Sequence, residues 1–325
     1  LGHTGGTIDK LESIPGYNCK LNPEEMKEIV NEIGCCIAVQ NDAIAPADGV
    51  LYSIRDVTDT VDSVPLITAS IVSKKAAEGL QALVLDVKCG NAAFMKTRDD
   101  AEELARSMVR TAQGLGIKTK AQITSMGQPI GSHVGNALEI VESIEVLKGK
   151  GSADTRDLVI LQGGELLAMT DEKLSPQQGR EMIAQVLDNG EALEKFRLMC
   201  VHQGVEEEFA QQLLRQPKFV LPASEAQTTI LSRTEGYVVG IDSMASALMA
   251  KSHGAGRYAI EDIVIPEIGF VFHVAQGKQV KENQPLLTFY HNRELSENEH
   301  MALQTLIVLS SQPVEDMERL ISIVE

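Results

Sequence analysis

The sequence predicts an α/β protein with a mostly parallel sheet flanked by helices, part of a small all-helical domain, and a C-terminal α+β domain. Helix and strand patterns alternate over residues 22–126, which is the β-α-β order of a parallel sheet covered by helices. Residues 135–215 are almost entirely helical in pattern, and from about Thr228 short apolar runs alternate with Gly and Pro. We therefore expect a central α/β domain over residues 1–43 and 80–227, part of a helical domain over 44–79, and the α+β domain over 228–325.

The first elements follow from helix start and stop signals. Ile8, Leu11 and Ile14 recur at helical spacing, so a helix begins near Thr7. In "NPEEMKEIVNEIG" an N-cap Asn and a first-turn Pro open a helix that ends at a Gly. "CCIAVQ" then predicts a short buried strand, and "VDSVPLITASIVSKKAAEGL" predicts a helix that ends at Gly79.

The next elements give the sheet. "ALVLDVKCG" is the clearest strand, apolar on both faces as parallel strands are. "RDDAEELARSMVRTAQGLG" is a strongly amphipathic helix, and "KTKAQITSM" is the next strand. Near the end of the chain, "SENEHMALQTLIVLSS" predicts a helix that starts at Ser296 with Glu299 completing a capping box.

Composition excludes several classes of protein. The 325 residues carry a net charge of −17, from 46 acidic and 29 basic residues, which argues against nucleic-acid binding. No apolar run approaches the roughly 18 residues of a membrane span, and no secretory signal is visible. The seven histidines are dispersed without zinc-ligand spacing, and no G-x-S-x-G hydrolase motif occurs.

The five cysteines are scattered, without C-x-x-C spacing, so neither a zinc ribbon nor a disulfide scaffold fits. We expect reduced thiols and a cytoplasmic protein.

A glycine pair followed by a hydroxyl residue opens the chain, in "LGHTGGTIDK". Unpaired N–H groups at a helix start favour an anion, and the Thr7 hydroxyl can add to such a site. The alternative is that Thr7 is a plain helix cap behind a flexible turn.

Arg55, Ser70 and Lys74 form a second candidate site. Ser70 and Lys74 are four residues apart, hence on one helix face, and Arg55 precedes that helix. A guanidinium, an ammonium and a hydroxyl suit a planar ligand with carbonyl oxygens and a ring N–H. The alternative is a solvated helix face.

Lys88 and Phe94 are further candidates because they lie at the carboxyl end of the strongest strand, where open α/β sheets bind ligands.

Together these segments resemble the thymidine/pyrimidine-nucleoside phosphorylase family. "GHTGGTIDKLESIPG" is similar to the second half of the family signature, "RDVTDTVDSVPLITASIVSKKAAEGL" to its base-binding segment, and "LVLDVKCGNAAFM" to the strand and loop that follow. The similarity continues more loosely through "EGYVVGID", "GAGR" and "AQGKQVKENQPL".

The resemblance implies a glycosyltransferase, specifically a pentosyltransferase, that cleaves thymidine or uridine with phosphate in pyrimidine salvage. It implies that Arg55, Ser70 and Lys74 bind the pyrimidine, with Arg55 and Lys74 catalytic, and that Tyr52 and Phe94 lie beside the base. Thr7 corresponds to a phosphate ligand in the central domain. Phosphate is then the co-substrate, no cofactor is required, and the protein is a cytoplasmic homodimer without a nucleic-acid or membrane partner.

One branch of the family holds a structural potassium ion, and Glu142 with the carbonyls of Ile130 and His133 matches three of its ligand positions. Family members also carry a segment ahead of the point where this sequence starts, with most of the phosphate ligands. Because this sequence does not contain that segment, we expect the chain by itself to be catalytically poor.

Two alternatives stay open at this stage. A phosphoribosyltransferase of related fold would need an acidic metal-diphosphate site, and no acidic pair lies near the glycine loop. A non-catalytic remnant that acts as a binding protein is favoured by the missing segment, whereas the retention of Thr7, Arg55, Ser70 and Lys74 argues against it.

Overall fold

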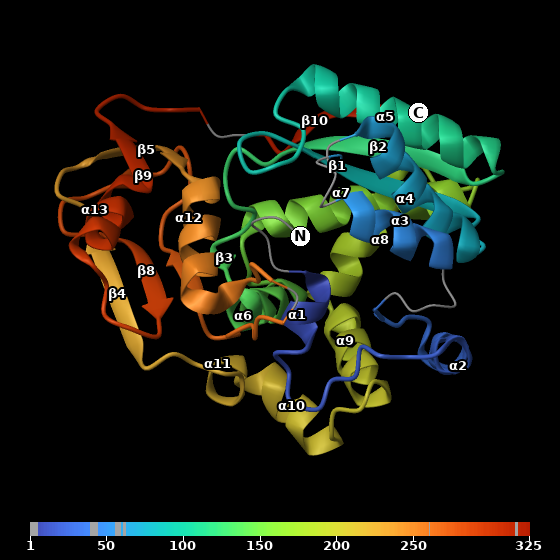
Figure 1. Cartoon of the computed structure of the whole chain (residues 1–325), viewed down its shortest axis with the longest axis horizontal. Helices are drawn as coiled ribbons and strands as arrows, with labels where there is room; N and C mark the ends of the chain where they lie inside the picture. Colours follow the sequence, from blue (N-terminus) through green and yellow to red (C-terminus); the bar gives the residue numbers. More distant parts are fainter. Residues whose placement is uncertain (1–5, 40–44, 56–59, 61–62, 260, 316–317) are drawn as a thin grey trace. The chain divides into compact units, whose positions relative to one another are not determined.

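A computed structural model of the chain describes residues 6–39, 45–55, 60, 63–259, 261–315 and 318–325, apart from the side chains of residues 52–54 (Figure 1). The chain forms two compact units. Unit 1 comprises Leu1–Ala38, Gly127–Arg156 and Leu187–Met317, and unit 2 comprises Val39–Met126, Asp157–Val186 and Glu318–Glu325. The three-domain division expected from the sequence stays a prediction.

Unit 2 is built on a sheet in which β2 (Lys118–Ser125) lies between β1 (Ala82–Cys89) and β10 (Leu320–Val324). β1 and β2 are parallel, in a register that pairs Ala82 with Lys118 and Cys89 with Ser125. β10 is antiparallel to β2. Among the described residues, only β1 and β2 pair in parallel, so the predicted mostly parallel sheet is not confirmed, and β10 was not predicted.

Helices cover this sheet. α5 (Arg98–Gly114) packs on β1 and β2 through buried alanines and on α4 (Val64–Ala77). α3 (Pro46–Arg55) precedes α4, and the predicted end of α4 near Gly79 is confirmed, with Gly79 at a φ of 68°. The amphipathic pattern of α5 is also confirmed, because its buried residues form one stripe.

α7 (Ala153–Thr170) and α8 (Pro176–Asp188), which lie mostly in unit 2, approach each other closely at glycines. A Cβ at Gly164 would lie 2.5 Å from the backbone nitrogen of Arg180, and one at Gly179 would lie 2.3 Å from the Gly164 carbonyl oxygen. Only residues without a side chain allow this separation.

Unit 1 has a helical half with its own apolar core. Its helices are α1 (Thr7–Leu11), α2 (Pro23–Ile33), α6 (Asn136–Leu147), α9 (Glu191–His202), α10 (Glu207–Arg215) and α11 (Pro217–Val220). α2 has the predicted ends: the Asn22 side chain accepts a hydrogen bond from the Glu25 N–H, and Gly34 at a φ of 88° ends the helix.

The predicted strand in "CCIAVQ" is wrong for the residues described, since 35–39 form no strand. Instead the buried amide of Gln203 holds this segment, donating to the Ile37 carbonyl (2.8 Å) and accepting from the Ile37 N–H (3.0 Å). The Gln203 side chain thus makes the two hydrogen bonds to the Ile37 backbone that a neighbouring strand would otherwise make.

The other half of unit 1 contains two antiparallel sheets, with strand orders β3-β6-β8-β4 and β7-β5-β9 among the described residues. The strands are β3 (His133–Val134), β4 (Ala226–Leu231), β5 (Gly236–Ile241), β6 (Gly269–Phe272), β7 (Gln279–Val280), β8 (Pro285–His291) and β9 (Ile307–Ser310). The helices are α12 (Ser243–Ala250), the π-helix η1 (Lys251–Ala255) and α13 (Glu297–Thr305). The core of this half includes the stacked rings of Phe270 and Phe289, with centroids 4.4 Å apart.

The predicted final helix is correct at its start and wrong at its end. Ser296 and Glu299 form the expected capping box, but α13 ends at Thr305 and the apolar residues that follow form β9. "LIVLS" is rich in branched apolar residues, and these are compatible with a buried strand as well as with a helix.

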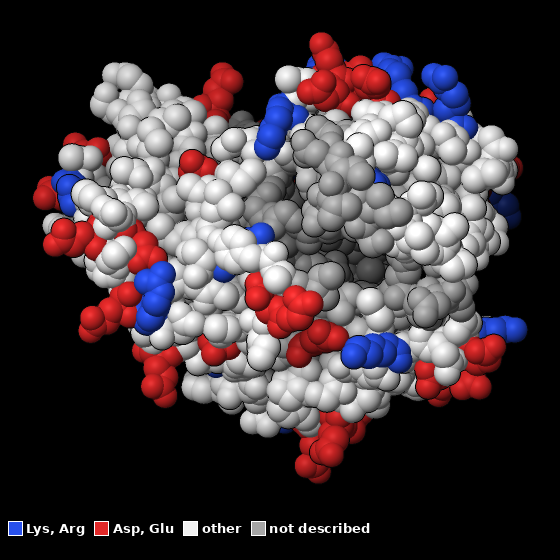
Figure 2. All heavy atoms as spheres, viewed as in Figure 1, with Lys and Arg blue, Asp and Glu red and all other residues white. Residues whose placement is uncertain are grey.

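Among the described residues, no helix combines the length and the apolar character needed to cross a bilayer. On the face drawn in Figure 2, acidic and basic side chains are interspersed, and the acidic ones are more numerous.

Candidate active site

The predicted pair Ser70 and Lys74 meets on α4 in unit 2. The Lys74 ammonium donates hydrogen bonds to the Ser70 hydroxyl (2.9 Å) and to the Ser70 carbonyl (2.9 Å). Ser70 is buried and Lys74 is half-buried. The four-residue spacing therefore places both groups on one helix face, as the sequence predicts.

Arg55 ends α3 and is also buried, with 6% of its surface exposed. Its guanidinium donates to the carbonyl oxygens of Thr60 (3.3 Å) and Leu66 (3.4 Å). Leu66 lies one turn before Ser70 on α4, so Arg55 reaches the row of residues that contains Ser70 and Lys74. The carbonyls of Thr60 and Leu66 thus anchor the guanidinium beside the helix that carries the other two groups.

Asp48 is a further member of this cluster that the sequence did not reveal. Its carboxylate accepts a hydrogen bond from the Lys74 ammonium, and only 10% of the Asp48 side chain is exposed. An acid in the first turn of a helix is ordinary, so the residue pattern gives no signal that Asp48 faces a lysine on another helix.

The loop after β1 presents Phe94, which is 56% exposed. The loop is fixed by hydrogen bonds from the Gly90 N–H to the Met95 carbonyl (3.0 Å) and from the Ala92 N–H to the Met126 carbonyl (3.2 Å). Phe94 therefore lies at the carboxyl end of the parallel pair β1–β2, as expected. The Lys88 ammonium is paired instead with Asp86 and Thr124, and the Tyr52 side chain lies outside the described residues.

In unit 1, Thr7 is the first residue of α1 and is exposed. Gly6 caps the helix, and its N–H donates to the Asp9 carboxylate (3.1 Å). Since Gly6 has no side chain, only this half of a capping box forms. Gly5, the other glycine of the predicted anion site, lies outside the described residues.

Glu142, also in unit 1, is a buried carboxylate enclosed by a turn. Its Oε1 accepts from the N–H (2.7 Å) and hydroxyl (2.8 Å) of Ser132 and from the Ser152 hydroxyl, and its Oε2 accepts from the His133 N–H (3.1 Å). Gly131 has a φ of 75°, and a Cβ there would lie 2.4 Å from Oε2.

Burial by itself would raise the pKa of Glu142, but hydrogen bonds from His133, Ser152 and Ser132 outweigh burial and lower the pKa to about 2. An ionised carboxylate inside the turn that carries Ile130 and His133 fits the chemistry of a cation ligand. The predicted potassium site stays a prediction, because the donors around Glu142 also satisfy it without a metal.

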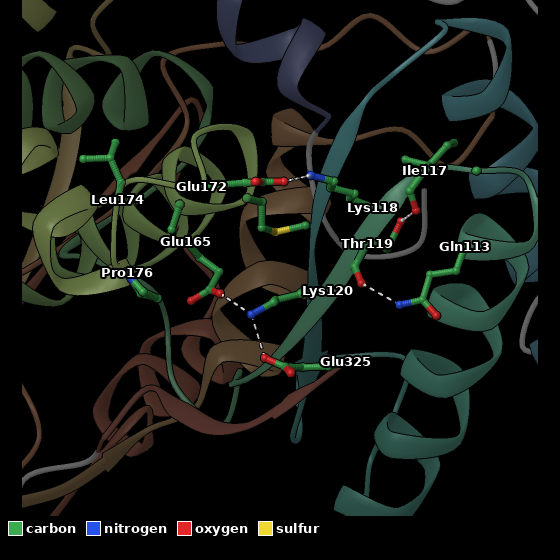
Figure 3. Close-up of a pocket in the computed structure, with 13 residues that line it drawn as sticks. Gln113, Ile117, Lys118, Thr119, Lys120, Glu165, Glu172, Leu174, Pro176 and Glu325 are labelled. Carbon is green, nitrogen blue, oxygen red and sulfur yellow. Dashed lines mark hydrogen bonds and ion pairs between the residues drawn. The ribbon is translucent and has the colours of Figure 1, made fainter.

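A separate cavity of about 630 Å³ lies in unit 2 near the start of β2 (Figure 3). There the Lys120 ammonium contacts the carboxylates of Glu165 (2.8 Å) and Glu325 (2.6 Å), and hydrogen bonds to both raise the pKa of Lys120. This cavity is at the opposite end of β2 from the loop of Phe94. Both of its lysines, Lys118 and Lys120, are already paired with carboxylates, so we do not place the reaction there.

Comparison with known proteins identifies the family. The α/β domain of the glycosyl transferase family matches residues 1–193, and the C-terminal domain of pyrimidine nucleoside phosphorylases matches residues 237–310. The chain is 42% identical over 317 residues to thymidine phosphorylase of Rattus norvegicus, covering 96% of this chain and 67% of that protein. It is 38% identical over 312 residues to pyrimidine-nucleoside phosphorylase of Staphylococcus epidermidis, covering 96% of this chain and 71% of that protein.

The chain belongs to the thymidine/pyrimidine-nucleoside phosphorylase family. It spans about two thirds of the length of its mammalian relatives, including thymidine phosphorylase of Homo sapiens, of which it covers 66% at 41% identity. The resemblance inferred from the sequence motifs is thereby confirmed.

Within this phosphorylase framework, the structure gathers Arg55, Ser70 and Lys74 around α4 and adds Asp48. Thr7, Glu142 and His133 belong to the other unit. The roles of all these residues stay predictions.

Proposed function

We propose that this protein cleaves pyrimidine nucleosides and deoxynucleosides with phosphate, releasing the free base and the sugar 1-phosphate. The observation that carries the proposal is the Ser70–Lys74 pair on α4, with the buried Arg55 bonded to Leu66 on the same helix, in a chain 42% identical to a thymidine phosphorylase. Thymidine, deoxyuridine and uridine share the carbonyl oxygens and the ring N–H that these groups would bind.

The chemistry follows from the charges. A phosphate oxygen attacks C1′ as the glycosidic C1′–N1 bond breaks, and the bonding electron pair leaves with the base. The sugar carries positive charge and the base carries negative charge in such a transition state. Arg55 and Lys74 donate to the pyrimidine oxygens and stabilise the departing anion more than the neutral base, which lowers the barrier.

Ser70 would orient the base. Its hydroxyl oxygen accepts from Lys74 and has a second lone pair for the ring N–H of the pyrimidine. In this proposal Asp48 holds the Lys74 ammonium in place, Phe94 packs beside the base, and Tyr52 takes the position that the family resemblance gives it.

Thr7 would contribute to the phosphate site, and phosphate would be the co-substrate, with no organic cofactor. Glu142 and the carbonyls of Ile130 and His133 would hold a potassium ion, which supplies structural charge and takes no part in bond breaking. A rise in melting temperature in KCl, absent in NaCl and abolished by Glu142→Gln, would support this ion site.

We also propose a cytoplasmic homodimer. All five cysteines are free thiols, as expected in a reducing compartment, and Val50 and Leu51 on α3 are 64% and 58% exposed, which suits a covered helical face. Light scattering of the chain and of Leu51→Glu tests the dimer: the substitution should yield monomers.

The function is tested by phosphate-dependent release of thymine and uracil from their nucleosides, together with calorimetric binding of each base. Lys74→Met should abolish turnover and weaken base binding at least tenfold, because it removes a charged donor to the base. Lys75→Met is the matched control, since Lys75 is its neighbour on α4 and pairs with Glu78 at 2.8 Å. Equal effects of the two substitutions, or no binding by the unsubstituted chain, would refute the proposed site.

The phosphoribosyltransferase alternative is not favoured, because the relatives described above are named phosphorylases. Adding phosphoribosyl diphosphate and a base in the same assay distinguishes the two reactions.

A further inference from the structure

Asp9 lies in the first turn of α1, two residues after Thr7, and both oxygens of its carboxylate are used. Oδ2 accepts from the Gly6 N–H (3.1 Å), and Oδ1 accepts from the Arg257 guanidinium (2.6 Å). Arg257 is 248 residues away in the sequence, yet both belong to unit 1. The Asp9 side chain is only 14% exposed, so solvent screens its charge incompletely.

An uncompensated carboxylate at this position would oppose phosphate binding. A phosphate group held by Thr7 would carry negative charge within a few residues of Asp9, and like charges at short range repel each other. Asp9 nevertheless serves the loop, because its carboxylate fixes the Gly6 N–H directly before Thr7. A phosphate site at Thr7 would therefore use Asp9 as the hydrogen-bond acceptor for Gly6, while the negative charge of Asp9 would lower its affinity for phosphate.

The backbone around Arg257 is fixed, so its guanidinium is directed at Asp9. Arg257 Nε donates to the Asp262 carbonyl (3.2 Å), and the Asp262 carboxylate accepts from the Tyr258 N–H (2.8 Å) and the Ala259 N–H (2.9 Å). Two residues earlier, the Ala255 carbonyl accepts from the side chain of the buried Asn136 at the start of α6 (2.9 Å).

We propose that Arg257 is a positioning residue for phosphate: it orients the Asp9 carboxylate against the Gly6 N–H and neutralises the charge of that carboxylate beside Thr7. This inference rests on the proposed function, and specifically on Thr7 as a phosphate ligand. Arg257 does not touch the reacting atoms. Its effect is on the affinity for phosphate and passes through Asp9.

The test is calorimetric titration of inorganic phosphate into the full chain and its variants. Arg257→Ala should weaken phosphate binding about five- to tenfold, because it leaves an unpaired carboxylate beside the anion. The double variant Arg257→Ala/Asp9→Asn should return to within about twofold of the original affinity, since asparagine keeps the acceptor for Gly6 without the charge. Thymine binding should be the same in all of these proteins.

Arg197→Ala is the matched control, because Arg197 forms an ion pair with Glu194 (2.6 Å) in the same unit. Arg257→Gln replaces Arg257→Ala if thermal melting shows that the alanine variant is unfolded.

The outcomes separate the two proposals. If the original chain binds phosphate and Thr7→Ala weakens that binding, but Arg257→Ala does not, the inference is wrong while the proposed function stands. The inference is equally wrong if the double variant binds no better than Arg257→Ala. If the original chain does not bind phosphate, or Thr7→Ala has no effect, the phosphate role proposed for Thr7 fails and the inference fails with it.

Discussion

The Lys74 ammonium lies 2.9 Å from the Ser70 hydroxyl oxygen, so two of the three polar groups proposed to bind the pyrimidine are hydrogen-bonded to each other before any ligand arrives. The hydrogen bond spans one turn of α4 and restricts both side chains to one face of the helix. A site that is ordered beforehand loses less conformational entropy on binding.

The Asp48–Lys74 ion pair makes the first prediction. Asp48→Ala removes the carboxylate that holds the ammonium, so Lys74 becomes mobile and we expect base binding to weaken about threefold to tenfold. Asp48→Asn keeps an oxygen acceptor and should lose less. Calorimetric titration of thymine measures both effects. Asp99→Ala, at the exposed start of α5, is the control, and an Asp48→Ala variant that matches this control would contradict the prediction.

The buried Glu142 carboxylate predicts a pH-dependent stability. Its pKa in the fold, about 2, is below the ordinary glutamate value, so ionised Glu142 stabilises the fold above pH 4.5 and this contribution is lost as the pH falls toward 2. Glu142→Gln should therefore lower the free energy of unfolding by about 3 kcal/mol at pH 7 and by progressively less in acid.

Urea unfolding of both proteins from pH 7 to pH 3 checks this expectation. Glu145→Gln provides the comparison, because Glu145 forms a partly exposed pair with Lys148 on the same helix. A destabilisation by Glu142→Gln that stays constant over this range would contradict the assigned pKa.

Gln203 gives the third prediction. Its buried amide accepts from the Tyr17 hydroxyl (3.0 Å) and the Ile37 N–H (3.0 Å), and donates to the carbonyls of Asn18 (3.0 Å) and Ile37 (2.8 Å). Gln203→Leu leaves all of these groups without that partner, so the free energy of unfolding should fall by about 3–4 kcal/mol. Tyr17→Phe removes one bond and should cost about 1 kcal/mol in the same chemical unfolding measurement. If Gln203→Leu and Tyr17→Phe lowered the free energy of unfolding equally, the bonds from Gln203 to Asn18 and Ile37 would contribute nothing to stability, and the prediction would be wrong.

The crossing of α7 and α8 gives the fourth prediction. Gly164→Ala adds a methyl group 2.5 Å from the Arg180 backbone nitrogen, a distance that only a movement of one helix can relieve. We expect a loss of about 1–3 kcal/mol in thermal or urea unfolding, as for other overpacked cores. Gly114→Ala is the control, because a Cβ at this helical glycine meets nothing within 4 Å. Unchanged stability in Gly164→Ala would mean that the helices are not held at this distance.

Local signals in the sequence predicted much of the fold. Asn22, Pro23 and Gly34 set the ends of α2, and Ser296 with Glu299 set the start of α13, because caps depend on residues only a few positions apart. The strands β1 and β2 were also predicted, β1 because it carries a long apolar stretch and β2 because it follows the amphipathic helix in β-α-β order.

What the sequence could not predict depends on contacts between distant residues. Residues 35–39 have strand-like composition, but Gln203, 166 residues away from Ile37, supplies the hydrogen-bond partners of the Ile37 backbone. Similarly, Ser70 and Lys74 were paired correctly by their spacing on one helix, whereas Asp48 and Arg257 act on partners in other elements. The pattern of apolar and polar residues within one segment gives no information about such contacts.

The pairing of β10 with β2 has a consequence for how the chain is made. The Ser125 N–H donates to the Arg319 carbonyl, and the Arg319 guanidinium donates to the Ser125 carbonyl across 194 residues. During synthesis, therefore, one edge of β2 stays unpaired until all of the intervening sequence and β10 itself have left the ribosome. At typical rates of about 5–20 residues per second, this delay is on the order of ten seconds or more. Throughout that interval the nascent protein exposes an unpaired edge of β2, which can pair with strands of other chains. We therefore expect this edge to be a site where chaperones prevent aggregation.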